Sequence, residues 1–187
     1  MKHVRIPLTF VVLAACAAAN PLPAQAPAPS TPTKPTSLQV TGAATFPLGN
    51  YANLLADLGW EAQAALIVRR GGFNQLRVEG VYYSTGYDDA ASNLAGSAEI
   101  YGGGIGFGRS TPSGTEFYGL AGAFRNAIGA CAASTCTEYS ETQFGTKLGV
   151  NAVLGHGRVR PVIDFHWLFT YSEPYASIIA LGAGLRF

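Results

Sequence analysis

The last eleven residues of the chain constrain its fold more than any other stretch. Apolar side chains occupy every second position from Ile179 to Phe187, and small or charged residues lie between them. This spacing places one set of side chains on each face of a β-strand. The sequence therefore predicts that the chain ends in a strand over residues 177–187, with its larger apolar side chains on one face.

The same alternation recurs through the rest of the chain. It predicts seven further strands, at residues 37–46, 59–69, 73–85, 94–109, 115–125, 139–154 and 158–170. Short Gly- or Pro-containing turns alternate with longer connections, among them a polar loop with Asp88 and Asp89 and a loop over residues 126–138. An even number of strands joined by hairpins predicts an all-β fold, an eight-stranded antiparallel up-and-down barrel.

Composition indicates where such a barrel would reside. Charged residues make up 12% of the chain, against about 25% in an ordinary soluble domain. The formal net charge is +1, which gives no support for nucleic acid or another polyanion as a partner. The apolar residues form no run long enough for a spanning helix, so they are spread over many short strands.

Periodicity alone does not say which face of the barrel is the outer one. The face with glycines, small residues and charges suits a narrow eight-stranded lumen. Aromatic residues lie near strand ends, where membrane-interface belts occur, namely Phe46, Trp60, Tyr118, Phe169 and Phe187. The strands carry almost no Lys, unlike a water-facing exterior. These features favour a transmembrane barrel, and the alternative is a soluble lipocalin-like barrel that binds an apolar ligand inside.

A transmembrane barrel would enclose charges of both signs. The residues predicted to face the lumen are Glu61, Arg77, Glu79, Arg125, Lys147, Asp164, His166 and Arg186. Charges in a narrow lumen must pair, because an unpaired charge loses its hydration without compensation. Such a network fills the lumen and argues against an open pore. The alternative use of these groups is a small ion path or a proton relay.

Two strands contain residues that disturb a regular ladder. Glycines at 102, 104, 106 and 108 share one face of a strand, which predicts close backbone approach or strong curvature, and a bulge there would change the register. Pro161 lacks the N–H that a ladder needs, so we expect it at the rim near a bulge.

Residues 1–26 are predicted to be a signal peptide. A basic start precedes an apolar core over residues 6–19 that is too short for a permanent membrane helix. Cleavage could follow Ala19 or Ala26. In a competing interpretation, the stretch from Leu13 to Cys16 resembles the lipobox of bacterial lipoproteins, and Cys16 would be lipidated. Residues 27–36 are Pro-rich and predict an extended linker before the barrel.

The end of the chain resembles the closing strand of bacterial outer-membrane barrels. Phe187, Leu185 and Gly182 match the terminal pattern of that family, whereas Ala180 stands where a polar residue is usual. Residues 37–187 resemble the small eight-stranded barrels of the OmpA/OmpX type. The resemblance implies an outer-membrane location, contact with outer-membrane lipid, recognition of the last strand by the barrel assembly machinery, and a monomer with both termini in the periplasm.

Two cysteines remain after the signal peptide. Cys131 and Cys136 both lie in the predicted external loop over residues 126–138. Export makes their oxidation to a disulfide the favoured interpretation. A metal site is the weaker option, because no His or further Cys lies nearby in the sequence.

The sequence contains no recognisable catalytic motif. It has no Gly-x-Ser-x-Gly elbow, no His-Glu-x-x-His and no phosphate loop. His166 beside Asp164 is better explained as a lumen pair than as a catalytic dyad. We therefore expect neither enzymatic activity nor a cofactor. The predicted role is structural or surface interaction through external loops, and a narrow porin-like channel is the main alternative.

Overall fold

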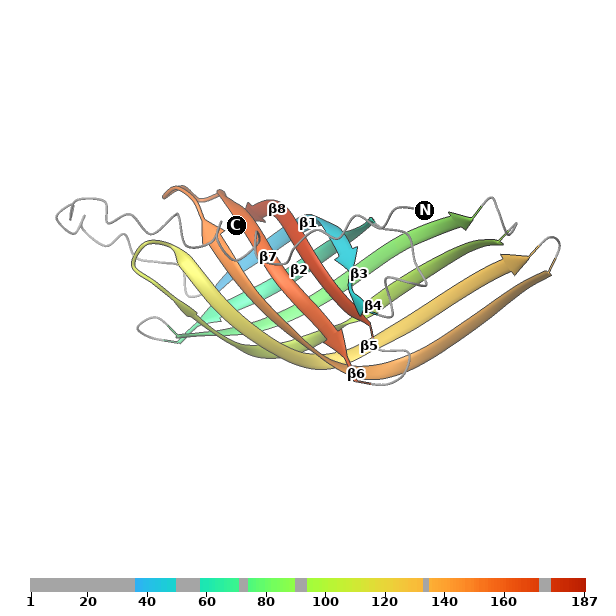
Figure 1. The fold of residues 1–187 in the computed structure, drawn as a ribbon. Coiled ribbons are helices and arrows are strands. Elements are labelled where there is room, and N and C mark those ends of the chain that lie inside the picture. The colour runs from blue at the N-terminus through green and yellow to red at the C-terminus, as the bar shows by residue number, and fades with distance from the viewer. Residues whose placement is uncertain (1–35, 50–57, 71–73, 90–93, 133–134, 172–175) are drawn as a thin grey trace. The chain divides into compact units, whose positions relative to one another are not determined.

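The strands form a closed antiparallel barrel. The computed structural model describes residues 36–49, 58–70, 74–89, 94–132, 135–171 and 176–187. Each strand pairs with the next and β8 pairs with β1 (Figure 1), which confirms the predicted eight-stranded fold. The strands are β1 (Thr36–Pro47), β2 (Gly59–Arg69), β3 (Asn74–Asp89), β4 (Leu94–Ser110), β5 (Thr115–Ala132), β6 (Thr135–Val153), β7 (Arg160–Thr170) and β8 (Ser177–Arg186).

Several predictions fall on residues that the structure does not describe. The signal peptide, the linker up to residue 35 and the candidate lipidation site Cys16 lie outside the described residues. The described part holds no helix that is both long and apolar enough to cross a membrane.

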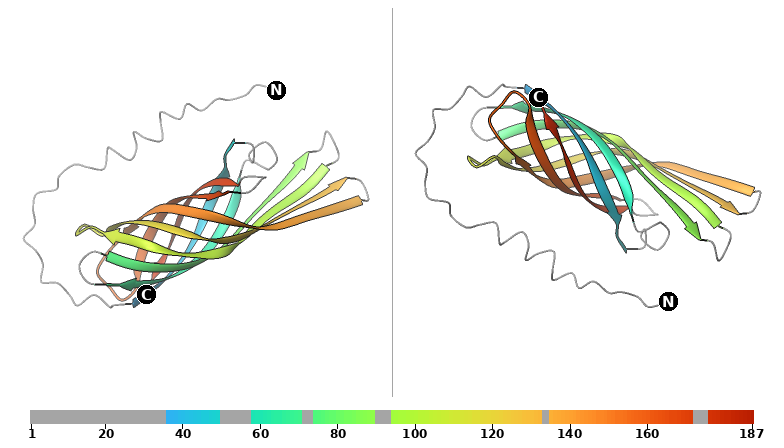
Figure 2. Two further views of the ribbon diagram at one scale, coloured as in Figure 1. Left: turned by 90° about the horizontal axis from the view of Figure 1, so that it is seen from below. Right: turned by 90° about the horizontal axis from the view of Figure 1, so that it is seen from above.

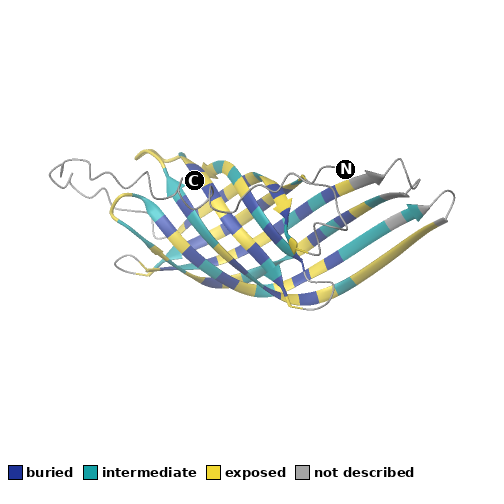
Figure 3. Cartoon of the chain, viewed as in Figure 1, coloured by how far each residue is buried: buried dark blue, intermediate teal, exposed yellow. Residues whose placement is uncertain are grey.

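Burial alternates along the strands, as Figure 3 shows. In β2, Glu61 and Gln63 are buried while Trp60 and Leu66 are exposed. In β7, Asp164 and His166 are buried while the apolar residues between and beside them are exposed. The charged side chains of these two strands thus lie inside the barrel and the large apolar side chains next to them lie outside, which confirms the predicted facing of β2 and β7.

The glycines of β4 allow its backbone to approach that of β5. A Cβ atom added to Gly106 would lie 2.7 Å from the Cα of Leu120, and one added to Gly104 would lie 2.8 Å from the carbonyl oxygen of Ala121. Real Cβ atoms do not come so close to a backbone, so a larger residue would push the strands apart. The register of β4 is continuous with both neighbours, and the bulge considered for this strand is absent.

The predicted facing of β5 is wrong. Tyr118 and Phe124 are buried inside the barrel, whereas Phe117 and Arg125 are exposed. The flanking strands explain this arrangement, because glycines on their inward faces leave room for large side chains. A Cβ on Gly145 of β6, for example, would lie 2.8 Å from the Phe124 ring. Tyr118 therefore belongs to no interfacial belt, while Phe46, Trp60 and Phe187 are exposed near strand ends.

Strands β3 to β6 continue beyond the closed barrel. Pairing of β2 with β3 ends at Trp60–Ser84, and pairing of β6 with β7 ends at Gly145–Thr170, but β3–β4 and β5–β6 pair onward to their tips. The result is a four-stranded sheet, here called the extension, that projects past the other strands (Figure 2). It comprises residues 85–89, 94–99, 126–132 and 135–144.

The extension replaces two predicted loops, at residues 86–89 and 126–138. Residues 86–89, 126–132 and 135–138 are strands, so the loop prediction is wrong there. Most residues of the extension are small or polar, and the large side chains of Ile128, Tyr139 and Phe144 do not form a continuous buried apolar row. The period-two contrast that identifies a strand is therefore missing from these stretches.

Pro161 lies near the start of β7, at the rim but without a bulge. The pairing of β7 with β8 runs through Pro161 in continuous register. Its carbonyl oxygen accepts a hydrogen bond from the N–H of Leu154 at 2.9 Å. The N–H that proline lacks could have formed a hydrogen bond only at this last position between β6 and β7. The ladder therefore loses at most one hydrogen bond at its end.

Candidate functional site

The middle of the barrel encloses an ion-pair cluster. The ammonium of Lys147, 1% exposed, lies 3.2 Å from Glu61 Oε1 and 2.6 Å from Glu79 Oε1. It also donates to Gln63 Oε1 at 2.5 Å. Three strands thus converge on one buried cation. We call the full set the central cluster: Glu61, Arg77, Glu79, Lys147, Asp164 and His166.

His166 connects two carboxylates within the central cluster. Its Nδ1 lies 2.5 Å from Asp164 Oδ2 and its Nε2 lies 3.0 Å from Glu61 Oε2. Only an imidazolium offers two N–H donors, whereas a neutral ring would turn a lone pair toward one carboxylate. With His166 as an imidazolium, three cations balance three carboxylates and the net charge of the central cluster is zero.

Arg77 and Tyr118 join β3 and β5 to this network. The Nε of Arg77 donates to Glu79 Oε2 at 2.7 Å, and its guanidinium lies 4.1 Å from the centroid of the Tyr118 ring. That is a cation–π distance. The Tyr118 hydroxyl donates to Asp164 Oδ1 at 2.8 Å. The alternation along β5 did not indicate this role of Tyr118, because it placed the residue on the outer face.

A second group of charges closes the barrel end where β8 terminates. Two nitrogens of the Arg186 guanidinium donate to the two carboxylate oxygens of Glu116, at 2.6 Å each. The same guanidinium also donates to Gln39 Oε1. Arg69 reaches the same carboxylate at 3.1 Å. We call Arg69, Glu116 and Arg186 the mouth cluster. Glu116 was not predicted to face inward, although it lies two residues from Tyr118 and so shares its face.

An apolar layer fills the interior on the far side of the central cluster. Along β3 and β7, Val81 and Leu168 come two residues farther from the mouth cluster than Glu79 and His166. Buried side chains of the interior are thus arranged in successive polar and apolar layers. The apolar layer consists of Val81, Tyr83, Ala98, Ile100, Phe124, Leu168, Ala176 and Ile178.

Of the residues predicted to face the lumen, Arg125 does not do so. It is exposed on the outer face of β5, one residue before the extension begins, and its guanidinium donates to Ser140 Oγ at 2.8 Å. The other predicted residues lie in the central cluster or the mouth cluster. Arg125 was misplaced together with the rest of β5, whose facing the small residues Ala121 and Ala123 had suggested.

The outer surface of the barrel carries a broad apolar band. Phe107 is 71% exposed, and Phe144, Leu148 and Ile105 are each more than half exposed. A soluble monomer rarely exposes contiguous apolar surface over more than a few hundred Å². This band indicates that an apolar environment surrounds the barrel.

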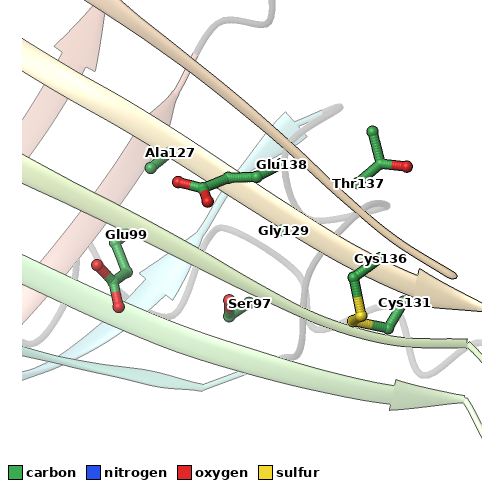
Figure 4. A pocket seen from close by; sticks show the side chains of 8 residues that line it. All are labelled: Ser97, Glu99, Ala127, Gly129, Cys131, Cys136, Thr137 and Glu138. Carbon is green, nitrogen blue, oxygen red and sulfur yellow. A yellow bond between two sulfur atoms is a disulfide. The ribbon is translucent and has the colours of Figure 1, made fainter. Parts of the chain in front are cut away.

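The disulfide lies in the extension rather than in a loop. Cys131 and Cys136 are bonded and sit directly opposite each other on β5 and β6. They border a shallow groove of about 400 Å³ on the outer face (Figure 4). Ala127 and Gly129 lie along its floor, and Glu99 and Glu138 line it. Within the described ranges, no group of three His, Cys, Asp or Glu is placed to hold a metal ion.

The residues of the predicted assembly signal lie along the seam that closes the barrel. Leu185 and Phe187 are exposed on the outer face, and Gly182 is opposite Ala43 of β1. The N–H of Phe187 donates to the carbonyl of Leu38 at 2.8 Å. Recognition of this strand by an assembly machinery stays a prediction.

Solved structures with the same fold are bacterial outer-membrane barrels. The attachment invasion locus protein Ail of Yersinia pestis, solved with the heparin analogue sucrose octasulfate, aligns with a TM-score of 0.59 at 16% identity, covering 81% of this chain and 97% of Ail. Neisserial surface protein A aligns with a TM-score of 0.56 at 15% identity, covering 82% of this chain and 96% of the neisserial protein.

The N-terminal barrel domain of OprF from Pseudomonas aeruginosa aligns with a TM-score of 0.53 at 12% identity, covering 81% of this chain and 97% of the domain. No protein-family profile and no curated protein sequence matches the chain. At these identities the likeness shows the fold: the chain folds as the small eight-stranded outer-membrane barrels do.

Proposed function

We propose that the protein resides in the bacterial outer membrane as a barrel with a filled interior that displays the extension outside the cell. The observation that carries this proposal is the distribution of polarity. Paired charges lie inside, and Phe107, Leu148 and their neighbours form an apolar band outside. A soluble lipocalin-like barrel has the opposite arrangement, so the soluble alternative finds no support.

Two arginine substitutions on the same face of β6 test the membrane location. Leu148 lies within the apolar band and Thr142 lies in the extension, and both are exposed. Arg at the middle of a bilayer costs about 2–4 kcal/mol in a barrel, and far less outside the membrane. Leu148→Arg should therefore reduce insertion into outer-membrane fractions and the mobility shift between unheated and boiled samples, whereas Thr142→Arg should not. If Leu148→Arg is harmless, the outer surface faces water.

The channel alternative has a separate test. The central cluster and the apolar layer occupy the interior, and Lys147 and His166 are almost fully buried. We expect purified protein in planar bilayers to show no steady single-channel conductance. Reproducible conductance steps from a folded, heat-modifiable preparation would favour the narrow channel.

The surface role predicts which end faces outward. An epitope tag at residues 133–134, between β5 and β6, should be accessible to antibody on intact cells. The same tag at residues 112–113, in the turn between β4 and β5, should become accessible only after permeabilisation. The reverse pattern would place the extension in the periplasm and end the surface-interaction proposal.

The character of a partner follows from charge. The extension carries Glu99, Glu138 and Glu141, and Arg125 lies one residue before its β5 segment begins. Ail was solved with the heparin analogue sucrose octasulfate, but the acidic surface of the extension would repel such a polyanion. The interaction role thus calls for a neutral or basic partner.

We also propose that the β8 strand, ending in Phe187, serves as the signal for barrel assembly. Outer-membrane lipid surrounds the protein, which is a monomer and not an enzyme.

A further inference from the structure

We propose that the barrel end at which β2, β4, β6 and β8 terminate binds the anionic headgroups of the phospholipids around it. We call it the basic end. This inference rests on the proposed membrane function and adds to it the class of lipid that the barrel selects.

Exposed arginines are distributed around the basic end. Arg70 follows β2, Arg109 lies near the end of β4, and Arg158 precedes β7. All three are exposed. Since the strands follow one another around the barrel, these guanidinium groups face the surroundings from well-separated strands. A lipid leaflet that encloses the barrel would meet a cation on several sides.

The mouth at this end adds further positive charge. Arg69 and Arg186 share the carboxylate of Glu116, and Arg160 stands on the inward face of β7 beside Arg186 in the register. Among the described residues, the carboxylates at this end are those of the Glu116 side chain and of the Phe187 terminus. The surrounding arginines therefore exceed the available anions, and the potential at the basic end is positive.

The opposite end has the opposite sign. The extension carries Glu99, Glu138 and Glu141, and β3 ends at Asp88 and Asp89. Charge is thus separated along the barrel axis, and anionic headgroups would gather at the basic end and avoid the extension.

Apolar neighbours favour a phospholipid over a free anion. Phe107 shares the outer face of β4 with Arg109 two residues on, and the half-exposed Val159 follows Arg158. A guanidinium matches a phosphate with two parallel hydrogen bonds. Beside it, the apolar side chains would contact the acyl chains of the same molecule. A free phosphate would use only half of this surface.

Spin-labelled lipids test the proposal. Full-length mature protein is reconstituted in phosphatidylcholine vesicles at low salt, with trace spin-labelled phosphatidylglycerol or phosphatidylcholine. The motionally restricted fraction of each label gives the relative affinity. We expect a preference for phosphatidylglycerol to which each exposed arginine contributes up to about fivefold, and which weakens in high salt.

The variants separate the possible outcomes. Arg70→Gln with Arg109→Gln and Arg158→Gln should lose most of the preference. Three Arg→Lys changes at the same positions keep the charge but not the two parallel hydrogen bonds, so they should keep part of the preference. Arg125→Gln, a single change of the same kind at the other end, should have no effect. An unchanged preference in the triple Gln variant, or an equal loss in Arg125→Gln, overturns the proposal. If neither label shows a restricted component in wild-type protein, the membrane function itself fails.

Discussion

At the residue scale, large side chains fit inside the barrel only where glycines on the adjacent strand leave space for them. Tyr118 and Phe124 of β5 occupy space that Gly145 and Gly149 leave free on β6. The absence of a side chain at Gly106 likewise allows the backbones of β4 and β5 to run close together. A narrow barrel can therefore hold both an ion network and aromatic rings, because its glycines contribute no side-chain volume.

A single added methyl group tests this close approach. Gly106→Ala would place its Cβ 2.7 Å from the Leu120 Cα, whereas Gly80→Ala on the outer face of β3 would meet its nearest atom at 3.8 Å. We expect Gly106→Ala to lower the free energy of unfolding by about 1–3 kcal/mol, as overpacking does, and Gly80→Ala to leave it nearly unchanged. Urea unfolding in lipid vesicles measures both. Equal effects would show that β4 and β5 can separate without cost.

Lys147 neutralises carboxylates from two strands, so its removal tests the central cluster. Lys147→Met leaves Glu61 and Glu79 without their shared cation. We expect destabilisation of about 3–5 kcal/mol, the usual cost of removing one partner from a buried ion pair. Adding Glu79→Gln restores charge balance and keeps an acceptor for Arg77, so the double variant should recover part of the loss in the same unfolding assay. A double variant less stable than Lys147→Met would contradict the pairing.

At the element scale, the extension depends on fewer neighbours than the barrel wall. Over residues 135–144, β6 pairs with β5 and not with β7. The disulfide between Cys131 and Cys136 lies within this hairpin. Local opening should therefore be easier in the extension than in the closed barrel, and the disulfide should limit it.

Removal of the disulfide should loosen the extension alone. In a Cys131→Ser, Cys136→Ser variant we expect faster amide hydrogen exchange over residues 126–144, because the cross-strand constraint is gone. Exchange in β7 and β8 and the heat-induced mobility shift should not change. Faster exchange throughout the barrel would show that the disulfide supports the whole fold.

At the scale of the whole molecule, closure joins the two ends of the described chain. The β1–β8 ladder runs from Gln39–Arg186 to Pro47–Ile178. Without it, β1 and β7 would each expose an unpaired edge, which an apolar environment does not tolerate.

Deletion of β8 should therefore abolish the barrel. A chain that ends at residue 176 is expected to aggregate and to show no mobility shift between unheated and boiled samples. The matched control replaces residues 129–138 with an Asn-Gly turn, which shortens the extension but leaves every β1–β8 pair in place. The control should keep the shift. Its loss in both variants would mean that the extension is also needed for closure.

The sequence alone determined the number of strands, the closed barrel and most of the strand facing. These follow from period-two alternation, which persists wherever one face meets an apolar environment and the other a polar interior. It also identified the charged residues of the central cluster, because a charge on a regularly alternating strand can be assigned to a face. The Cys131–Cys136 pairing was predicted from their proximity in a chain expected to be exported.

Only the tertiary structure decided the facing of β5, the extension and the partners of each charge. The inward face of β5 depends on the glycines of β4 and β6, so no pattern within β5 could reveal that Glu116 and Tyr118 point inward while Arg125 points outward. The extension lacks a contrast between its faces, so its strands resembled loops. The contact of Lys147 with Glu61 joins residues far apart in the chain, and barrel closure and register, rather than local sequence, bring them together.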